Sequence, residues 1–305
     1  MADRKSLLLV ANQASQVLAR NIAAQLDIPF TEMITKQFAD GEIYHAFPQS
    51  LSGKVLVIVG TTHSDQSHQE LVDLISGGRQ YNATSVNVIV PFLGYSTMER
   101  AKPHSHEIPK GITRTRQIFM ARPNSVSFVD LHSEAILHAH GGDIHTRNVW
   151  TDQVVANAIR RSGITGYVLV SPDYGFSKRV ARIASILDCP HTAADKDRFD
   201  TDKTIVGQVS SVVKGKTVII CDDMIRTGGS IIQTAHRCLE AGARKVVAHA
   251  THLVMAGNAM EKFGKSPIAK IYGSDSYPGV RSNELLEVYS IAPLLADVIR
   301  HQLQL

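Results

Sequence analysis

Cysteine is scarce in this chain of 305 residues, which contains three, at Cys189, Cys221 and Cys238. Their number is odd, they lie in apolar segments and no two have CxxC spacing, so neither a disulfide framework nor a zinc site is indicated. No run of about 18 apolar residues occurs, and the apolar run near the N-terminus is too short for a signal peptide. We therefore expect a soluble protein in the reducing cytoplasm, with no membrane association.

Runs of Lys or Arg are also absent. The chain has 32 Lys and Arg residues against 28 Asp and Glu residues, a formal net charge of +4. Nucleic-acid-binding proteins usually gather their positive charge in clusters, so this class is disfavoured, and an anionic small molecule fits the mild positive charge better. The hydrophobic content of 44% excludes disorder, and the length is sufficient for two ordinary domains with separate cores.

Short apolar runs alternate with longer segments of helical period, a pattern typical of βα units around a mostly parallel sheet. The expected strands are Leu7–Val10, Val55–Val59, Val86–Pro91, Val126–Val129, Tyr167–Ser171, Val218–Asp222, Val246–His249 and Ala269–Tyr272. The expected helices are Ser15–Leu26, Gln66–Gly77, Ser177–Leu187 and Ile231–Ala241.

The stretch Ala139–Asp152 lies between two βα series of similar size and is the expected domain boundary. We therefore predict two α/β domains of related architecture, covering residues 1–146 and 147–305. Each expected strand ends in a polar or glycine-bearing loop, which is where ligands bind in open α/β sheets.

The most informative segment is VIICDDMIRTGGS, residues Val218–Ser230. An apolar strand is followed by two carboxylates, and TGGS then opens a helix. Glycines let the backbone approach a phosphate closely, while hydroxyl groups and free N–H groups at the helix start donate to its oxygens. Asp222 and Asp223 are suited to accept hydrogen bonds from two ribose hydroxyls or to reach a metal ion.

A plainer interpretation is a strand followed by a capped helix, with Asp and Gly as turn residues. The adjacent double aspartate favours the phosphate site. The segment resembles the phosphoribosyl-diphosphate-binding motif shared by phosphoribosyltransferases and by the pyrophosphokinases that make their substrate.

Further segments resemble the ribose-phosphate pyrophosphokinase family in order and spacing over nearly the whole chain. Each is common by chance when taken alone, and the complete series carries the resemblance. The segments are FADGE at Phe38–Glu42, VDLH at Val129–His132, SPDYG at Ser171–Gly175, ATHL at Ala250–Leu253, SDSYP at Ser274–Pro278 and SIAPLLADVIR at Ser290–Arg300.

The resemblance implies two phosphoribosyltransferase-like domains, each a mostly parallel sheet flanked by helices, with the ATP side in the first domain and the ribose phosphate side in the second. It implies Mg²⁺ as cofactor, ATP and a ribose phosphate as substrates, and a homo-oligomer built from dimers, up to a hexamer. The implied site residues are Lys196 and Arg198 for catalysis, Phe38, Asp40, Glu42, Arg100 and His132 for ATP, Asp222, Asp223, Arg226, Thr227, Gly228, Gly229 and Ser230 for the ribose phosphate, and His132 and Asp173 for the metal.

Two of these assignments have a plainer alternative. A lone histidine such as His132 is more often structural than a ligand, although this one follows a strand end and an aspartate. The polar stretch that contains Lys196 and Arg198 has the composition of a solvated charged loop. Its place after a βαβ unit favours the mobile catalytic loop of the family.

Two departures from the family pattern bear on substrate binding. Where the family reads Tyr-Ala-Arg-Gln-Asp-Arg, this chain reads YSTMER from Tyr95 to Arg100, so one ATP-facing arginine is replaced by Thr97. The phosphate loop begins with Arg226 where the family has aspartate. A guanidinium suits bidentate phosphate contact and admits a more anionic acceptor.

Three hypotheses follow. The first is diphosphate transfer from ATP to the anomeric hydroxyl of ribose 5-phosphate. The second keeps this chemistry but uses an extended ribose phosphate, such as ADP-ribose, as acceptor. The third is a non-catalytic regulatory relative, which the retained His132, Asp173, Lys196 and Arg198 disfavour. A phosphoribosyltransferase is weaker still, because such an enzyme needs one domain and no adenine loop.

Overall fold

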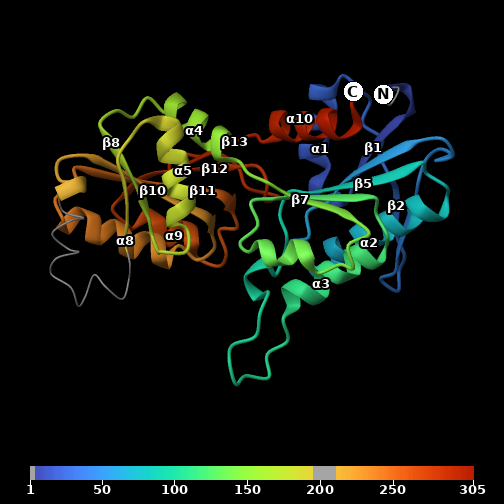
Figure 1. The fold of residues 1–305 in the computed structure, drawn as a ribbon, viewed down its shortest axis with the longest axis horizontal. Coiled ribbons are helices and arrows are strands. Elements are labelled where there is room, and N and C mark those ends of the chain that lie inside the picture. Colours follow the sequence, from blue (N-terminus) through green and yellow to red (C-terminus); the bar gives the residue numbers. More distant parts are fainter. Residues whose placement is uncertain (1–3, 195–210) are drawn as a thin grey trace. The chain divides into compact units, whose positions relative to one another are not determined.

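The computed structural model describes residues 4–194 and 211–305, and Figure 1 shows its ribbon. The chain divides into two compact units. Unit 1 consists of residues 1–149 together with 290–305, and unit 2 consists of residues 150–289. Each unit is an α/β structure with a parallel sheet and helices on it, as the alternating apolar runs predicted.

The sheet of unit 1 has the strand order β1-β4-β5-β6-β7, and every neighbouring pair is parallel. Its strands alternate their side chains between two faces, so that Leu56 and Ile58 of β4 pack on one face with Leu71 and Leu74 of α2. Figure 1 shows α2 and α3 on one side of this sheet and α1 on the other. The element bounds are β1 Leu7–Ala11, α1 Gln16–Leu26, β4 Val55–Val59, α2 Asp65–Gln80, β5 Ser85–Val90, α3 Lys110–Met120, β6 Ser125–Val129 and β7 His145–Val149.

The sheet of unit 2 has the strand order β13-β12-β11-β10-β8-β9 and is also parallel throughout. Ile220 of β10 packs in the cluster on the α8 face, whereas its neighbour Ile219 packs in the cluster on the α4 and α5 face. Both faces of the sheet are therefore covered, which explains why its strands read as continuous apolar runs. The bounds are α4 Asp152–Arg161, β8 Tyr167–Ser171, α5 Ser177–Leu187, β9 His191–Ala193, β10 Thr217–Ile225, α8 Gly229–Glu240, β11 Lys245–Leu253, α9 Ala259–Gly264, β12 Ile268–Ser274 and β13 Leu286–Tyr289.

A separate antiparallel hairpin, β2 (Ile34–Gln37) and β3 (Ile43–Ala46), carries the FADGE loop at its turn. Every residue of β2 is exposed, and β3 is exposed or half-buried. The sequence analysis missed both strands, because neither has the apolar run of a buried strand. It also missed the short edge strands β7, β9 and β13 for the same reason.

The C-terminal helix α10 (Ala292–Leu303) belongs to unit 1, although the sequence analysis placed residues 147–305 together in the second domain. Its apolar face packs on α1, the Arg300 guanidinium donates to the Gln25 carbonyl oxygen, and the Gln302 amide donates to Asn87 Oδ1 at 2.9 Å. These contacts join the end of the chain to the first sheet. No pattern in the sequence indicates that the last helix of the chain packs on the first unit.

Within the described residues, no helix combines the length and apolar character that a membrane crossing requires.

Candidate functional site

The paired carboxylates lie inside β10 rather than after it. The sequence analysis ended this strand at Asp222, but pairing with β11 continues to Met224 opposite His252 and Ile225 opposite Leu253. The side chain of Asp222 is half-buried and that of Asp223 is buried. Because the backbone of β10 is held by β11, the two carboxylates occupy fixed positions near the carboxyl edge of the sheet.

The surroundings of Asp222 make its negative charge costly. Burial raises the pKa of Asp222 well above its ordinary value, and the charges of Asp223 and then Asp173 raise it further, while a hydrogen bond from the Asp223 N–H, at 2.9 Å to Oδ1, opposes the shift. Asp173 follows the adjacent parallel strand β8, and its Oδ1 accepts from the Phe176 N–H at 3.0 Å. The charges of Asp223 and Asp173 therefore both act on Asp222, at the ends of two neighbouring strands.

This arrangement is chemically suited to hydroxyl groups and to hard cations. A carboxylate accepts hydrogen bonds from the hydroxyls of a sugar, and Mg²⁺ prefers oxygen ligands, often one or two carboxylates completed by substrate phosphates and water. Among the described residues, no group of three or more His, Cys, Asp and Glu side chains has the arrangement of a complete metal cage. A magnesium ion shared with substrate phosphates fits this edge better than an all-protein site.

The phosphate loop runs from Arg226 to Ser230 and leads directly into α8. Gly228 adopts a left-handed conformation with φ 78° and ψ −3° at the N-cap position, and no side chain caps the helix. Thr227, Gly229 and Ser230 are exposed. The loop is fixed from behind, because the Ala256 N–H donates to the Arg226 carbonyl oxygen at 2.8 Å. The uncapped N–H groups of α8 and the nearby hydroxyls are thus available to an anion.

Gly228 has a second reason to be glycine. A Cβ built on it would lie 2.6 Å from two ring carbons of Phe263, a fully buried side chain. The neighbour is a ring packed in the core of unit 2, so it has little freedom to move.

We expect Gly228→Ala to raise the KM for the ribose phosphate by about tenfold, because left-handed backbone costs a non-glycine residue about 1–2 kcal/mol and the ring contact displaces the loop further. Steady-state kinetics over a range of acceptor concentrations measures this change. Gly264→Ala, in the same unit but outside the loop, is the matched control, since a Cβ added to Gly264 would meet no atom within 4 Å and its φ is not positive. Equal effects of the two substitutions would contradict the assignment of the strain to Gly228.

Arg226 stands at the start of the phosphate loop and is exposed. Burial raises the pKa of the Tyr277 hydroxyl, and the positive charge of Arg226 partly opposes that shift, so the guanidinium lies near this half-buried tyrosine. Tyr277 belongs to the SDSYP segment after β12. The structure therefore brings the SDSYP segment to the phosphate loop through Arg226 and Tyr277.

In unit 1, the FADGE loop closes the β2–β3 hairpin. The Phe38 N–H donates to the Glu42 carbonyl oxygen at 2.8 Å, and the Glu42 N–H donates to Asp40 Oδ1 at 3.1 Å. The Phe38 ring is 42% exposed, and the Lys36 ammonium lies 4.9 Å from its centroid. An exposed aromatic ring at a fixed turn can stack on a planar ligand such as a nucleobase.

Arg100 and His132 meet at one cavity of about 670 Å³ in unit 1. Both side chains are exposed, and the Arg100 guanidinium lies 3.7 Å from the Glu99 carboxylate. Part of the YSTMER segment, which departs from the family pattern, also lines this cavity. The lining residues are Thr97, Met98, Glu99, Arg100, Ala101, Lys102, Pro103, Glu107, Ile108 and His132. Its lining combines apolar side chains with cationic ones, and Glu99 and Glu107 pair with Arg100 and Lys102 there.

The catalytic and metal assignments stay predictions. Lys196 and Arg198 lie outside the described residues. His132 belongs to unit 1 and Asp173 to unit 2, so their joint binding of a metal stays a prediction.

Sequence reasoning missed a buried ionic network beneath the site in unit 2. The Arg179 guanidinium is 5% exposed and donates to Asp152 Oδ1 at 2.9 Å and to the Thr151 hydroxyl at 2.9 Å. The same group donates to the Thr251 hydroxyl at 3.4 Å, within the ATHL segment at the end of β11. The one available signal was an arginine on the apolar face of the predicted helix, beside Val180 and Ile183.

Two family models match the chain, one to each unit. The N-terminal domain of ribose phosphate pyrophosphokinase matches residues 7–112, and the phosphoribosyl transferase domain matches residues 152–276.

The chain is similar to curated proteins along nearly its full length. Ribose-phosphate pyrophosphokinase 1 of Streptococcus pneumoniae is 32% identical over 302 residues, covering 96% of this chain and 92% of that protein. The ribose-phosphate pyrophosphokinase of Thermosipho africanus is 30% identical over 300 residues, covering 97% and 94%. The crystal structure of phosphoribosylpyrophosphate synthetase from Mycobacterium smegmatis superposes with a TM-score of 0.84 at 27% identity, covering 98% of this chain and 99% of that one.

Proposed function

Because the chain belongs to the ribose-phosphate pyrophosphokinase family, we propose that it transfers the terminal diphosphate of ATP to the anomeric hydroxyl of ribose 5-phosphate. In this reaction the bond between the α-phosphate's bridging oxygen and the β-phosphorus breaks, and the anomeric oxygen forms a new bond to the β-phosphorus. AMP leaves, and the hydroxyl proton is lost. The products are phosphoribosyl diphosphate and AMP.

The observation that carries the proposal is the presence of two different sites in one chain. Unit 2 supplies paired carboxylates and a glycine-bearing loop at a helix N-terminus, which suit a ribose and its phosphate. Unit 1 supplies an exposed aromatic turn, which suits a nucleobase, and a cavity in which Arg100, Lys102 and His132 can contact phosphates. A phosphoribosyltransferase needs the first of these and has no use for the second.

We assign roles to the residues on this basis. Asp222 and Asp223 accept hydrogen bonds from the ribose hydroxyls, while Thr227, Gly228, Gly229 and Ser230 hold the 5-phosphate with Arg226 beside them. Phe38, Asp40 and Glu42 bind the adenine, and Arg100 and His132 bind the phosphates of ATP. Lys196 and Arg198 stabilise the charge that develops on the migrating diphosphate.

Magnesium is the expected cofactor, and the carboxylates of unit 2 fit it. The repulsion among Asp173, Asp222 and Asp223 would be relieved by a divalent cation at that edge. When bound, the ion neutralises phosphate charge and orients the reacting groups. Asp173, and His132 from unit 1, are the residues that we propose to hold it.

We further infer a cytoplasmic, dimer-based homo-oligomer, up to a hexamer. The location follows from the substrates, because ATP and sugar phosphates are intracellular metabolites. The β2–β3 hairpin, which carries the predicted adenine loop, supports the oligomer, since its strands are exposed or half-buried and so offer surface to a second subunit. The family resemblance likewise implies an ATP site completed by a neighbouring subunit.

A coupled assay of AMP release tests the acceptor. The enzyme is supplied with ATP and Mg²⁺ and then with ribose 5-phosphate, with ADP-ribose, or with no acceptor. We expect AMP to form with ribose 5-phosphate at a rate far above the other two. The extended acceptor and the non-catalytic relative are not favoured by the comparisons. Release of AMP with ADP-ribose alone would contradict this choice, and no release with either acceptor would contradict the activity.

A further inference from the structure

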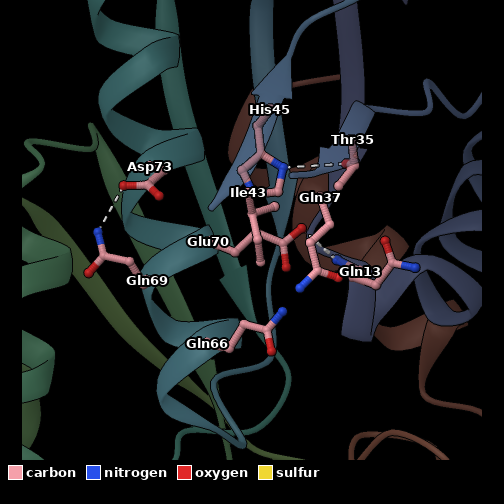
Figure 2. Close-up of a pocket in the computed structure, with 9 residues that line it drawn as sticks. All are labelled: Gln13, Thr35, Gln37, Ile43, His45, Gln66, Gln69, Glu70 and Asp73. Carbon is pink, nitrogen blue, oxygen red and sulfur yellow. Dashed lines mark hydrogen bonds between the residues drawn. The ribbon is translucent and has the colours of Figure 1, made fainter. Parts of the chain in front are cut away.

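A second cavity of about 570 Å³ lies in unit 1 between the β2–β3 hairpin and α2 (Figure 2). The helix presents Gln66, Gln69, Glu70 and Asp73, which fall on one face because they are spaced by three or four residues. Opposite them stand Thr35, Gln37, Ile43 and His45 of the hairpin, and Gln13 closes one end. None of these residues has a role in the function proposed above.

The charge of this cavity is opposite to that of the chain. Its lining contains the carboxyl groups of Glu70 and Asp73, and neither Lys nor Arg is among the described residues that line it. His45 is the one basic side chain there, and its Nδ1 lies 3.3 Å from the Thr35 hydroxyl. A phosphate or another anion would have no Lys or Arg side chain to pair with in this cavity. It would also be repelled by the two carboxyl groups. The lining therefore disfavours ATP, ribose phosphates and inorganic phosphate.

Glu70 is the central group of the cavity. The residue is 8% exposed, and one carboxylate oxygen, Oε1, accepts from the Gln13 N–H at 2.9 Å. The other oxygen, Oε2, has no hydrogen-bond partner in the part of the chain that the structure describes. Burial raises the pKa of Glu70; the Gln13 N–H and the charge of His45 oppose this only in part, and the charge of Asp73 adds to it. A buried carboxylate without a matching cation is costly, and a bound cation would remove that cost.

Amide groups surround this carboxylate. Figure 2 shows the side chains of Gln37 and Gln66 directed toward the space beside the Glu70 carboxyl group, whereas the side-chain amide of Gln13 extends away from it. These three amides make no hydrogen bond within the described residues, whereas the Gln69 amide donates to Asp73 Oδ1 at 2.8 Å. Each free amide oxygen is an acceptor for an N–H donor. The amide groups can donate as well as accept, so the Glu70 carboxyl group is what favours a cation, and the Gln37 and Gln66 amide oxygens beside it can accept from its N–H groups.

We propose that this cavity binds a small organic cation that carries a primary amine or guanidinium group. The charged end of the ligand pairs with Glu70 and donates to the amide oxygens around it. The volume is in the range of small-molecule sites, so the ligand is a compact amine with an aliphatic body rather than a single inorganic ion. Ile43 offers that body an apolar contact.

The bound cation would join two elements of unit 1. Four lining residues flank the turn of the β2–β3 hairpin, and four others come from α2. In the described part of the chain, the hydrogen bonds of strands β2 and β3 join these two strands to each other. A ligand that bridges the hairpin to α2 therefore holds the hairpin strands in place.

Isothermal titration calorimetry with agmatine and spermidine on the full chain, without nucleotide, tests the proposal. We expect saturable binding of at least one amine, and hydrogen exchange of the amides in β2 and β3 slowed by its addition. Glu70→Gln keeps the side-chain shape and should weaken binding at least tenfold, because a charge-assisted contact is lost. Glu284→Gln, which removes an exposed carboxylate of unit 2, should leave the affinity unchanged.

Gln66→Lys provides a second variant, because Gln66 is exposed and its replacement leaves the core intact. The new ammonium would occupy the cavity beside Glu70 and abolish amine binding. The proposal is overturned if neither amine binds the wild-type protein saturably, if both variants bind like wild type, or if adenosine binds there and the amines do not. Binding is measured without catalysis, so its failure is distinct from a failure of the proposed transferase activity.

Discussion

Replacing Lys196 or Arg198 by alanine is expected to lower kcat by about two orders of magnitude, with a much smaller change in either KM. The physical reason is that diphosphate transfer concentrates negative charge on the migrating group at the transition state, and a cationic side chain contacting that group contributes most at that moment. Steady-state kinetics with ATP, Mg²⁺ and ribose 5-phosphate measures both parameters.

Lys203→Ala is the matched control, because it removes the same charge from the same polar stretch of the sequence. We expect its kcat to stay near that of the wild type. Near-normal turnover of both Lys196→Ala and Arg198→Ala would show that the catalytic cations lie elsewhere. A loss confined to KM would instead assign them to ground-state binding.

The two α/β sheets were predictable from the sequence, whereas the elements around their edges were not. Strands such as β4 and β10 are buried on both faces and read as unbroken apolar runs. The hairpin strands β2 and β3 are exposed and polar, so no period separates them from a loop. The position of α10 depends on its packing against α1, nearly the whole chain away, and a local pattern cannot report such a contact.

The candidate site was likewise predictable only in part. The segment Val218–Ser230 predicted a phosphate loop, because paired carboxylates and adjacent glycines are unusual together between a strand and a helix. The continuation of β10 through Asp223 to Ile225 was not predictable, because it depends on pairing with β11. The cavity around Glu70 was also hidden, since its residues come from a helix, an exposed hairpin and Gln13.

The ribose phosphate should lose its binding site when the paired carboxylates are neutralised. Asp222→Asn and Asp223→Asn keep the size of each side chain and remove its charge. Each is expected to raise the KM for ribose 5-phosphate by about tenfold or more, because a hydrogen bond to a charged group contributes about 1.5–3 kcal/mol. Because the two neighbouring charges interact, the double variant should differ from the product of the single effects, while ATP binding, measured by calorimetry, stays unchanged.

The raised pKa of Asp222 gives this prediction a pH signature. Binding of ribose hydroxyls requires the charged carboxylate, so acceptor affinity should fall as the pH falls through the raised pKa, at a higher pH than for an ordinary aspartate. Asp222→Asn should abolish that part of the pH dependence. The folded state holds this proton more tightly than the unfolded state, so the contribution of Asp222 to stability is present at low pH and is lost as the pH rises through its folded pKa.

Asparagine resembles the protonated form of the side chain, so Asp222→Asn should not lower the unfolding temperature at neutral pH, even though it weakens acceptor binding. An unchanged unfolding temperature together with weaker acceptor binding distinguishes a residue that contacts the ligand from one that supports the fold. A variant that unfolds earlier and loses ATP and ribose 5-phosphate binding equally would show that Asp222 supports the fold of unit 2. The loss of acceptor binding alone, in a protein at least as stable as the wild type, would assign the carboxylate to the sugar.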